Sequence, residues 1–316
     1  MIEEAAIFHN PADVSVPAVR AHQTLVGVVL LGGGVRPTRF NTSIARSVLE
    51  LPYRDGRTLF QEWCEEVSTL SATRGEGRLP LRILMDKGGN APAALTRDVF
   101  APGVAVRFER DPSELRGTGG LLHDISLEYH DNDVLLVANA AQILLEPLLE
   151  LVEILGLEKS DLALLTHRRG TPSTLMLVRC GCLKSLPEIG YIDMKEQALP
   201  QLASRYDVRV CTLDETATLG LRTASSYIAG LRVIHSRQTG EPVQEWRSTF
   251  QLIEKGASVD TSARLHDSVV LRGARVGPGA VVVRSVICDG ATLPRNAVVV
   301  QKLITREGQF DAEDNG

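Results

Sequence analysis

The residues best suited to chemistry come directly after the first apolar run of the chain, Val26–Leu31. Three glycines and two arginines follow it: Gly32, Gly33, Gly34, Arg36 and Arg39. Glycines permit a tight turn whose backbone N–H groups converge on an anion, and guanidinium groups pair with phosphate oxygens through two hydrogen bonds. The stretch therefore indicates either a site for a phosphate-bearing ligand or a plain strand-to-loop turn with solvated arginines.

The spacing of these glycines excludes two common nucleotide-binding loops. A dinucleotide fingerprint needs a third glycine where Pro37 stands, and a Walker-type phosphate loop needs a Gly-Lys-Ser/Thr ending that is absent. The histidines form no metal-binding pair on one helix, and no serine lies in the Gly-x-Ser-x-Gly turn of hydrolases. The five scattered cysteines lack zinc spacing and indicate reduced structural thiols.

From residue 26 to residue 237, apolar runs of strand length alternate with amphipathic segments of helix length. Val26–Leu31 and the run at 133–139 are apolar almost throughout, as is typical of strands buried on both faces of a parallel sheet. Further strands are expected at 81–85, 105–109, 162–166, 175–178 and 208–212, and helices at 59–70, 90–100, 121–129, 144–155, 194–204 and 225–237. The alternation predicts an α/β fold with a mainly parallel, Rossmann-like sheet and helices on both faces.

Past Trp246 the helical periodicity disappears and a six-residue repeat replaces it. One set of apolar residues is Val259, Leu265 and Leu271, and a second, in another phase, is Val281, Ile287, Leu293 and Val299. This repeat predicts a parallel β-helix of two or three coils. The expected organisation is a lead-in segment at 1–24, the α/β domain at 25–240, a linker at 241–256, the β-helix at 257–304 and a disordered acidic tail at 305–316.

Two stretches near the N-terminus carry a resemblance to a known family. The segments at 33–40 (GGVRPTRF) and 46–51 (RSVLEL) resemble the G-G-x-G-T-R-L and K-P-L-L-P-V signature of sugar-phosphate nucleotidyltransferases, also called nucleotide-sugar pyrophosphorylases. The resemblance covers most of 26–300 and implies a nucleotidyltransferase sheet followed by a left-handed β-helix. It implies that Arg36, Arg39 and Arg46 stabilise the phosphates during catalysis, and that the backbone of Gly32, Gly33 and Gly34 binds the nucleotide.

Further motifs extend the resemblance and also weaken it. The segment 114–120 (ELRGTGG) resembles the family's L-G-T-A-G loop, which implies that Arg116, Gly117, Thr118 and Gly119 seat the base; capping of the following helix is the alternative. Asn139 matches the first position of the N-G-D motif and is counted with the nucleotide-binding residues. Ala141 and Gly220 stand where the family has its two metal-binding aspartates.

These replacements bear on the cofactor. Mg²⁺ requires oxygen ligands, commonly from one or two carboxylates, so Mg²⁺ is possible but its usual ligands are absent. Asp131, Asp133 and Asp214 are nearby acids that could substitute for them. The family's sugar-binding insert is also missing after the segment at 166–173.

Composition limits the classes of partner that the protein could bind. A net charge of −5 argues against a general nucleic-acid binder, and no apolar run approaches the length of a membrane span. The first residues lack the apolar core of a secretory signal, so a cytoplasmic protein is expected. A short β-helix leaves apolar faces open, so a homo-oligomer is expected.

The resemblance, together with the replaced aspartates and the missing insert, is compatible with more than one function. The first hypothesis is transfer of a nucleotide from a nucleoside triphosphate to a sugar 1-phosphate, forming a nucleotide-sugar and pyrophosphate, weakened by the missing aspartates and insert. The second is a non-catalytic nucleotide-binding regulatory or assembly subunit. A β-helix acyltransferase, with His266 in the repeat, is a distant third.

Overall fold

A computed structural model of the chain describes residues 23–32, 38–44, 46–54, 56–75, 77–85, 103–110, 116–156, 160–168, 173–240 and 250–314. Its largest element is a seven-stranded sheet. The strands are β1 (Leu25–Leu31), β2 (Leu79–Met85), β3 (Val104–Arg110), β4 (Val134–Asn139), β6 (Leu162–His167), β7 (Met176–Arg179) and β8 (Val208–Leu213). The helix expected at 90–100 lies outside the described residues.

The sheet has the order β3-β2-β1-β4-β7-β6-β8. Neighbouring strands are parallel except that β7 runs antiparallel to β4 and β6. The expected mainly parallel sheet is therefore confirmed, with one exception. The exception has a physical cause: β6 ends at His167 and β7 begins at Met176, and so short a connection makes a hairpin and leaves no room for a crossover helix.

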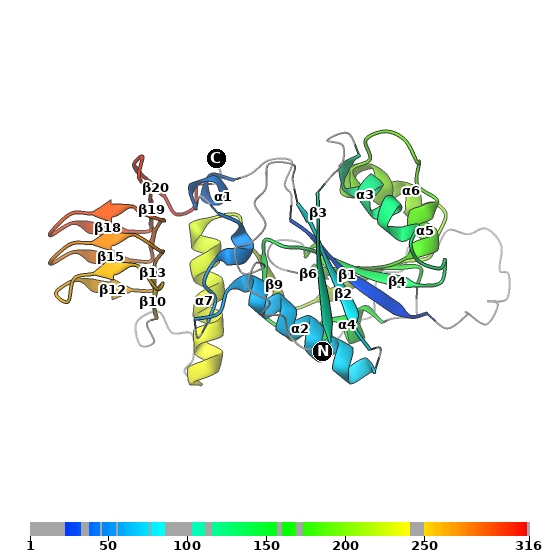
Figure 1. Ribbon diagram of the computed structural model, residues 1–316, viewed down its shortest axis with the longest axis horizontal. Helices are drawn as coiled ribbons and strands as arrows, with labels where there is room; N and C mark the ends of the chain where they lie inside the picture. Colours follow the sequence, from blue (N-terminus) through cyan, green and yellow to red (C-terminus); the bar gives the residue numbers. More distant parts are fainter. Residues whose placement is uncertain are drawn as a thin grey trace.

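Helices cover both faces of this sheet, as expected (Figure 1). Successive side chains of a strand point to opposite faces, so Val28 and Leu30 belong to one core cluster and Val29 to another. The first cluster contains α2 (Leu59–Arg74), α4 (Leu148–Leu155) and α7 (Ala224–Thr239). The second contains α3 (Gly117–Ser126), α5 (Cys180–Lys184), the π-helix η3 (Met194–Ala198) and α6 (Leu199–Ala203). Within the described ranges, no helix is both long enough and apolar enough to cross a membrane.

A small two-stranded ribbon lies beside the sheet and was not predicted. It pairs β5 (Gln142–Leu144) with β9 (Thr218–Gly220) in antiparallel fashion. The helix expected from residue 144 begins only at Leu148, after Pro147. Strand β5 follows β4 in the chain, and β9 precedes α7. Their pairing therefore brings Asn139 and Gly220 to one edge of the α/β domain.

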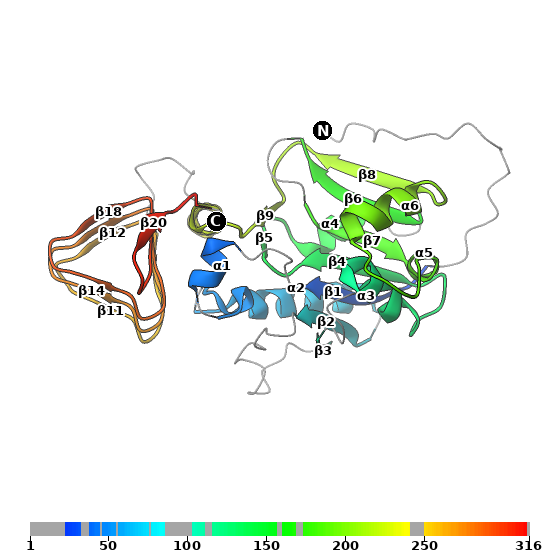
Figure 2. The same ribbon diagram turned by 90° about the horizontal axis from the view of Figure 1, so that it is seen from above.

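The C-terminal part is a stack of short parallel strands that form three sheets. The chain visits the sheets in turn, and Figure 2 shows the resulting triangular outline. The first sheet contains β10 (Gln251–Ile253), β13 (Ser268–Val270), β16 (Val286–Ile287), β19 (Lys302–Ile304) and β20 (Gln309–Asp311). The second contains β11 (Ser258–Val259), β14 (Arg275–Val276) and β17 (Thr292–Leu293), and the third β12 (Arg264–His266), β15 (Val281–Val283) and β18 (Val298–Val300).

The repeat of this C-terminal stack explains why the six-residue pattern changes phase. Equivalent positions recur every 17 residues, as Ser268 and Ser285 do, and the Ser285 N–H donates to the Ser268 hydroxyl. A period of 17 is one residue short of three hexads, so each turn must contain one shortened step. Leu271 is accordingly not an interior residue of the stack but packs in the cluster shared with the α/β domain. Val281 is half-buried and lies outside the interior cluster of the stack.

Two expected boundaries need correction. The stack begins before residue 257, because Gln251 already pairs with Ser268. The tail is not disordered from residue 305 to Asp314: β20 pairs antiparallel with β19, and Ala312 is 1 % exposed. The acidic composition of the tail suggested disorder, but Phe310 and Ala312 supply the apolar contacts that hold it.

The C-terminal stack joins the α/β domain through α7, which lies between them (Figure 1). One continuous core cluster contains Tyr227 and Leu231 of α7 together with Val269 and Val286 of the stack. The Arg232 guanidinium lies 3.2 Å from the fully buried carboxylate of Asp267. The stack is therefore packed on its own α/β domain by both apolar and ionic contacts.

Candidate functional site

The carboxyl ends of β1, β4 and β9 meet at one edge of the α/β domain. The Ala140 N–H donates to the Leu31 carbonyl at 3.0 Å, and the Leu221 N–H donates to the Ala141 carbonyl at 2.8 Å. Gly33, Gly34 and Arg36, which the sequence assigned to this edge, lie outside the described residues. The other expected residues can be placed.

Gly32 is at the edge, and its lack of a side chain has a structural reason. Its N–H donates to the Leu84 carbonyl at 2.7 Å, and a Cβ on Gly32 would lie 2.8 Å from the same oxygen. Glycine is thus required for the close approach of β1 to β2, whatever binds beyond it.

A short helix, α1 (Arg39–Ser43), brings Arg39 to this edge. Thr38 caps the helix by accepting from the Asn41 N–H, and the Asn41 side chain donates to the Leu221 carbonyl at 3.4 Å. Phe40 anchors the helix in the core with its ring 5.8 Å from that of Tyr227. Arg39 follows the cap and leaves the core, with 39 % of its side chain exposed.

The Arg39 guanidinium is held by the C-terminal segment. Its Nε lies 2.7 Å from the Asp314 carboxylate, and its Cζ lies 4.4 Å from the centre of the Phe310 ring. Among the described residues, no hydrogen bond joins its terminal nitrogens to the protein, and the buried Nε contacts Asp314 as an ion pair and not through a hydrogen bond. Two N–H₂ groups of a half-exposed cation thus remain for an anionic ligand.

Arg46 does something else, which corrects the catalytic role expected for it. Its side chain is 5 % exposed and forms two hydrogen bonds with Glu254, at 2.7 and 2.5 Å. Asp289 lies 3.4 Å away. Burial alone would lower the pKa of Arg46, but Glu254 and Asp289 raise it above its ordinary value. Arg46 is a permanently charged ion-pair partner, called the Arg46 joint below, that links the α/β domain to the C-terminal stack. It has no donor directed to a ligand.

The loop expected to seat the base is occupied by protein contacts. The Gly119 N–H donates to the Ile192 carbonyl at 2.8 Å, and the Thr118 hydroxyl accepts from the Met194 N–H at 3.0 Å. Gly117 has φ +66°, and a Cβ there would lie 2.5 Å from the Ile192 carbonyl oxygen. The close packing of the segment around Ile192 accounts for glycine at both positions.

The side chain of Arg116 is similarly engaged. It forms two hydrogen bonds with Asp124, at 3.0 and 2.6 Å, and others with the carbonyls of Gly190 and Gly120. Helix α3, which Arg116 precedes, covers the sheet face opposite α2. Arg39 and Arg116 therefore do not form one site: Arg39 belongs to the edge beside α1, and Arg116 to a hydrogen-bond network with Asp124 near the start of α3.

Asn139 lies at the edge but uses its side chain for local structure. Its amide oxygen accepts from the Ala141 N–H at 2.7 Å, and its own N–H donates to the Thr174 hydroxyl at 3.1 Å. Gln142, which the sequence reasoning missed, has 3 % exposure, and its amide oxygen accepts from the same hydroxyl at 3.2 Å. Its buried Nε2 has no hydrogen-bond partner among the residues that the structure describes. In the sequence, only its position directly after Ala141 indicated that Gln142 would lie at this edge.

The residues at this edge do not fit Mg²⁺. Ala141 and Gly220 offer no side-chain oxygen, and a Cβ on Gly220 would meet no atom of the described residues within 4 Å. The described ranges contain no cluster of three or more His, Cys, Asp or Glu suited to a metal ion. Asp131 pairs with Lys184 at 2.7 Å, at the opposite end of β4, and Asp133 immediately precedes that strand. Neither can replace the absent carboxylates.

Asp214, the third candidate, is also misplaced for a metal at this edge. It follows β8, the outermost strand of the sheet beyond β6 and β7. Its carboxylate lies 3.3 Å from Arg168 at the surface. No acid suggested by the sequence therefore replaces the two missing aspartates.

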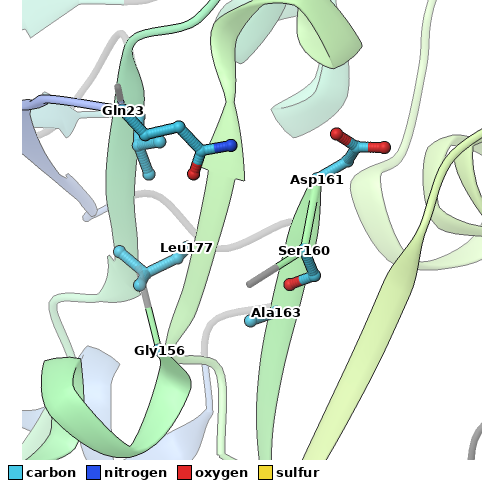
Figure 3. A pocket seen from close by; sticks show the side chains of 7 residues that line it. Gln23, Gly156, Ser160, Asp161, Ala163 and Leu177 are labelled. Atoms are coloured by element: carbon cyan, nitrogen blue, oxygen red, sulfur yellow. The ribbon is translucent and has the colours of Figure 1, made fainter. Parts of the chain in front are cut away.

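A small pocket lies elsewhere, between β4, β6 and β7 (Figure 3). Gln23, Ser160 and Asp161 supply its polar atoms, and Leu177 and Ala163 its apolar wall. Val134 and Ser160 lie at the starts of β4 and β6, so the pocket is at the edge of the sheet opposite Asn139. Its described lining contains no arginine and no set of groups suited to catalysis.

Comparisons with known proteins add distant similarities. No family model and no curated protein matches the sequence. Among solved structures, HddC from Yersinia pseudotuberculosis complexed with GMP-PN is 14 % identical, with a TM-score of 0.49 over 66 % of this chain and 100 % of that one. Rv0371c from Mycobacterium tuberculosis H37Rv in complex with manganese is 17 % identical, with a TM-score of 0.40 over 66 % and 99 %. These similarities are too distant to assign a family.

Proposed function

We propose that this protein is a sugar-phosphate nucleotidyltransferase-like protein that binds a nucleotide or another phosphate ligand at the edge beside α1 and transfers nucleotides weakly or not at all. The observation that carries the proposal is Arg39, a half-exposed guanidinium whose carboxylate partner in the described part of the chain contacts Nε and not the terminal nitrogens. The space around Gly220 and the meeting of β1, β4 and β9 give a ligand room beside it.

The proposed ligand contacts are narrower than the sequence resemblance suggests. Arg39 is the principal cation, with Arg36 and the backbone of Gly32–Gly34 as further contacts. A nucleoside triphosphate, a nucleotide-sugar or a sugar phosphate would each offer the oxygens that these groups bind. Arg46 and Arg116 are excluded from the proposal because their guanidinium groups are bonded to carboxylates of the protein.

Weak transfer follows from the chemistry of the two replaced positions. The family's reaction needs charge neutralisation on the phosphates, a contribution that carboxylate-held metal provides and that is typically worth several kcal/mol. Ala141 and Gly220 cannot hold such an ion, and the chain passes from the β6–β7 hairpin directly into α5 without a sugar-binding insert. We expect pyrophosphate release from nucleoside triphosphates and sugar 1-phosphates to be undetectable or very low.

Titration of matched arginine variants tests the binding site. Arg39→Ala should weaken nucleoside triphosphate binding roughly ten-fold in a calorimetric titration at low salt, and salt should weaken binding to the unmodified protein because it screens the attraction. Arg237→Ala is the control, since Arg237 is 47 % exposed and pairs with one carboxylate, that of Glu146, at 2.7 Å. Unchanged affinity in Arg39→Ala would place the site elsewhere.

A non-catalytic regulatory or assembly subunit is the second candidate, and the Arg46 joint favours it. A side chain that the resemblance assigns to catalysis serves instead to fasten the stack to the α/β domain. Pyrophosphate release separates the candidates: robust turnover by the unmodified protein would exclude the non-catalytic subunit, and binding without turnover would support it.

The C-terminal stack is proposed to be a left-handed β-helix that mediates a homo-oligomer. Its support is the three-sided arrangement of parallel strands and the outer face of the third sheet, where Val298 and Val300 are 68 % and 48 % exposed. Such exposed valines side by side are typical of an interaction surface. Val298→Lys with Val300→Lys should reduce the mass measured by light scattering to that of a monomer; a monomeric unmodified protein would contradict this.

The cytoplasm is the proposed location. All five cysteines are buried, and they form no disulfide within the described residues, although the chain has enough of them for two. Burial raises the pKa of Cys64 and of Cys288 to about 12, so these thiols stay protonated and unreactive. Buried thiols that are not joined in disulfides are usual in a reducing compartment.

A further inference from the structure

The C-terminal segment crosses from the stack back to the α/β domain. Strand β20 pairs antiparallel with β19, and the Ala312 N–H donates to the Gln301 carbonyl at 3.0 Å. The Ala312 carbonyl then accepts from the Ser225 N–H at the start of α7, also at 3.0 Å. Figure 1 shows the end of the chain beside α1. Hydrogen bonds to the stack and to α7 therefore hold the segment before it reaches Arg39.

Two residues of this segment hold the Arg39 guanidinium in different ways. The Phe310 ring lies against its face, with 4.4 Å between Cζ and the ring centre, and Phe310 itself packs on the main core. The Asp314 carboxylate approaches Nε at 2.7 Å. The ring restricts the plane of the guanidinium and the carboxylate restricts its rotation in that plane. The edge of the guanidinium between its two terminal nitrogens is a different edge from the one that carries the Nε contact.

A free arginine side chain has many rotamers, and ordering it on ligand binding reduces affinity. A guanidinium that is already ordered avoids that loss. We propose that Phe310 and Asp314 are positioning residues that orient the terminal nitrogens of Arg39 toward a phosphate group, so that β20 completes the ligand site. This inference rests on the proposed function, because it assumes that Arg39 contacts the ligand.

The alternative is that Asp314 competes with the ligand for Arg39. The geometry favours positioning, because a phosphate takes the two terminal nitrogens of a guanidinium while Asp314 contacts Nε. Asp314 is 34 % exposed, so water and salt weaken its repulsion of a bound phosphate. The Phe310 contact carries no charge and can only order the arginine.

Calorimetric titration of the full-length protein with inorganic tripolyphosphate at low salt tests the proposal without assuming a base. Phe310→Leu removes the ring but keeps an apolar side chain, and should weaken binding roughly three-fold, the size expected for an exposed cation–π contact. Phe310→Trp keeps an aromatic face and should retain the affinity. Asp314→Ala should weaken binding to a similar extent, and Asp314→Asn, which keeps an oxygen for Nε, should recover part of the loss.

A matched control lies in the same strand. Asp311 pairs with Lys302 within the β19–β20 hairpin, so Asp311→Ala removes an ion pair of the segment without touching Arg39. We expect it to leave tripolyphosphate affinity unchanged. Thermal unfolding of each variant confirms that the hairpin is still folded.

A double-mutant cycle separates positioning from a general structural role. In an Arg39→Ala background, Phe310→Leu and Asp314→Ala should cause no further loss, because the group that they orient is gone. Equal losses in both backgrounds, unchanged affinity in both single variants, or tighter binding by Asp314→Ala would each overturn the proposal. The proposed function fails separately, if Arg39→Ala itself binds tripolyphosphate as the unmodified protein does.

Discussion

Arg39 and Arg46 lie at the two ends of one short stretch, and their surroundings differ in every respect that decides what a cation does. The Arg46 side chain is 5 % exposed and lies between Glu254 and Asp289, while that of Arg39 is 39 % exposed and has one carboxylate, on Nε. A buried guanidinium whose terminal nitrogens are bonded to a carboxylate of the protein stabilises a structure, and a half-exposed one whose carboxylate contact is at Nε can bind a ligand. The same residue type therefore serves as a joint in one region and as a candidate site in the other.

The largest effect on stability should come from removing the Arg46 guanidinium. Arg46→Ala leaves two carboxylates in a partly buried cluster without their cation, which typically costs about 3–5 kcal/mol of unfolding free energy. Arg39→Ala, at the exposed site, should cost less than about 1 kcal/mol. Urea unfolding of the two variants measures both values, and equal losses would remove the distinction between the two regions.

The next effect concerns the positions that lost their carboxylates. Ala141→Asp with Gly220→Asp should restore Mg²⁺-dependent nucleoside triphosphate binding, by roughly ten-fold, because Mg²⁺ prefers carboxylate oxygens. The open space at Gly220 accommodates the new side chain. Sugar transfer should stay near zero because the insert is absent. Titration with and without Mg²⁺ checks the first point and pyrophosphate release the second; rapid transfer would show that the insert is dispensable.

A smaller effect is the pH dependence of the joint. Burial, above all, raises the pKa of Asp289, although Arg46 opposes the shift. A carboxyl group whose pKa is higher in the folded state stabilises that state at low pH. This contribution is lost as the pH rises from the unfolded value of 3.8 through the raised folded pKa.

Asp289→Asn removes that titration, while buried acids such as Glu62 remain in both proteins and cancel in a difference. The stability of the Asn variant relative to the unmodified protein should therefore increase from about pH 4 to about pH 7. Denaturant unfolding at several pH values measures it. A difference that stays constant, or decreases, would mean that Asp289 does not titrate in this way.

The sequence predicted the larger elements because their signals are local. Continuous apolar runs gave β1 and β4, and the Thr58 cap with its apolar face gave α2, which the structure extends to Arg74. The ribbon of β5 and β9 could not be predicted, because three-residue strands joined across 142 and 220 have no local pattern. The antiparallel direction of β7 likewise depends on pairing partners and not on its own residues.

The candidate site was less predictable than the fold. The spacing of Arg39 and Arg46 fitted one family motif, yet the partner that buries Arg46 is Glu254, which is 208 residues away in the sequence. The Phe310 contact with Arg39 is equally remote, and an acidic tail gave no sign of it. Gln142 was missed because an amide in an apolar segment has no signal until its partners are known.

The most direct test of the central claim is a titration of the unmodified protein with nucleoside triphosphates, in the presence and absence of Mg²⁺. Binding at the Arg39 edge without metal ligands predicts weak, salt-sensitive affinity that Mg²⁺ does not improve, because the ion would bind the ligand and screen its charge. Affinity that rises ten-fold or more with Mg²⁺, a gain of about 1.4 kcal/mol, would contradict the account. It would mean that the protein holds a metal despite Ala141 and Gly220.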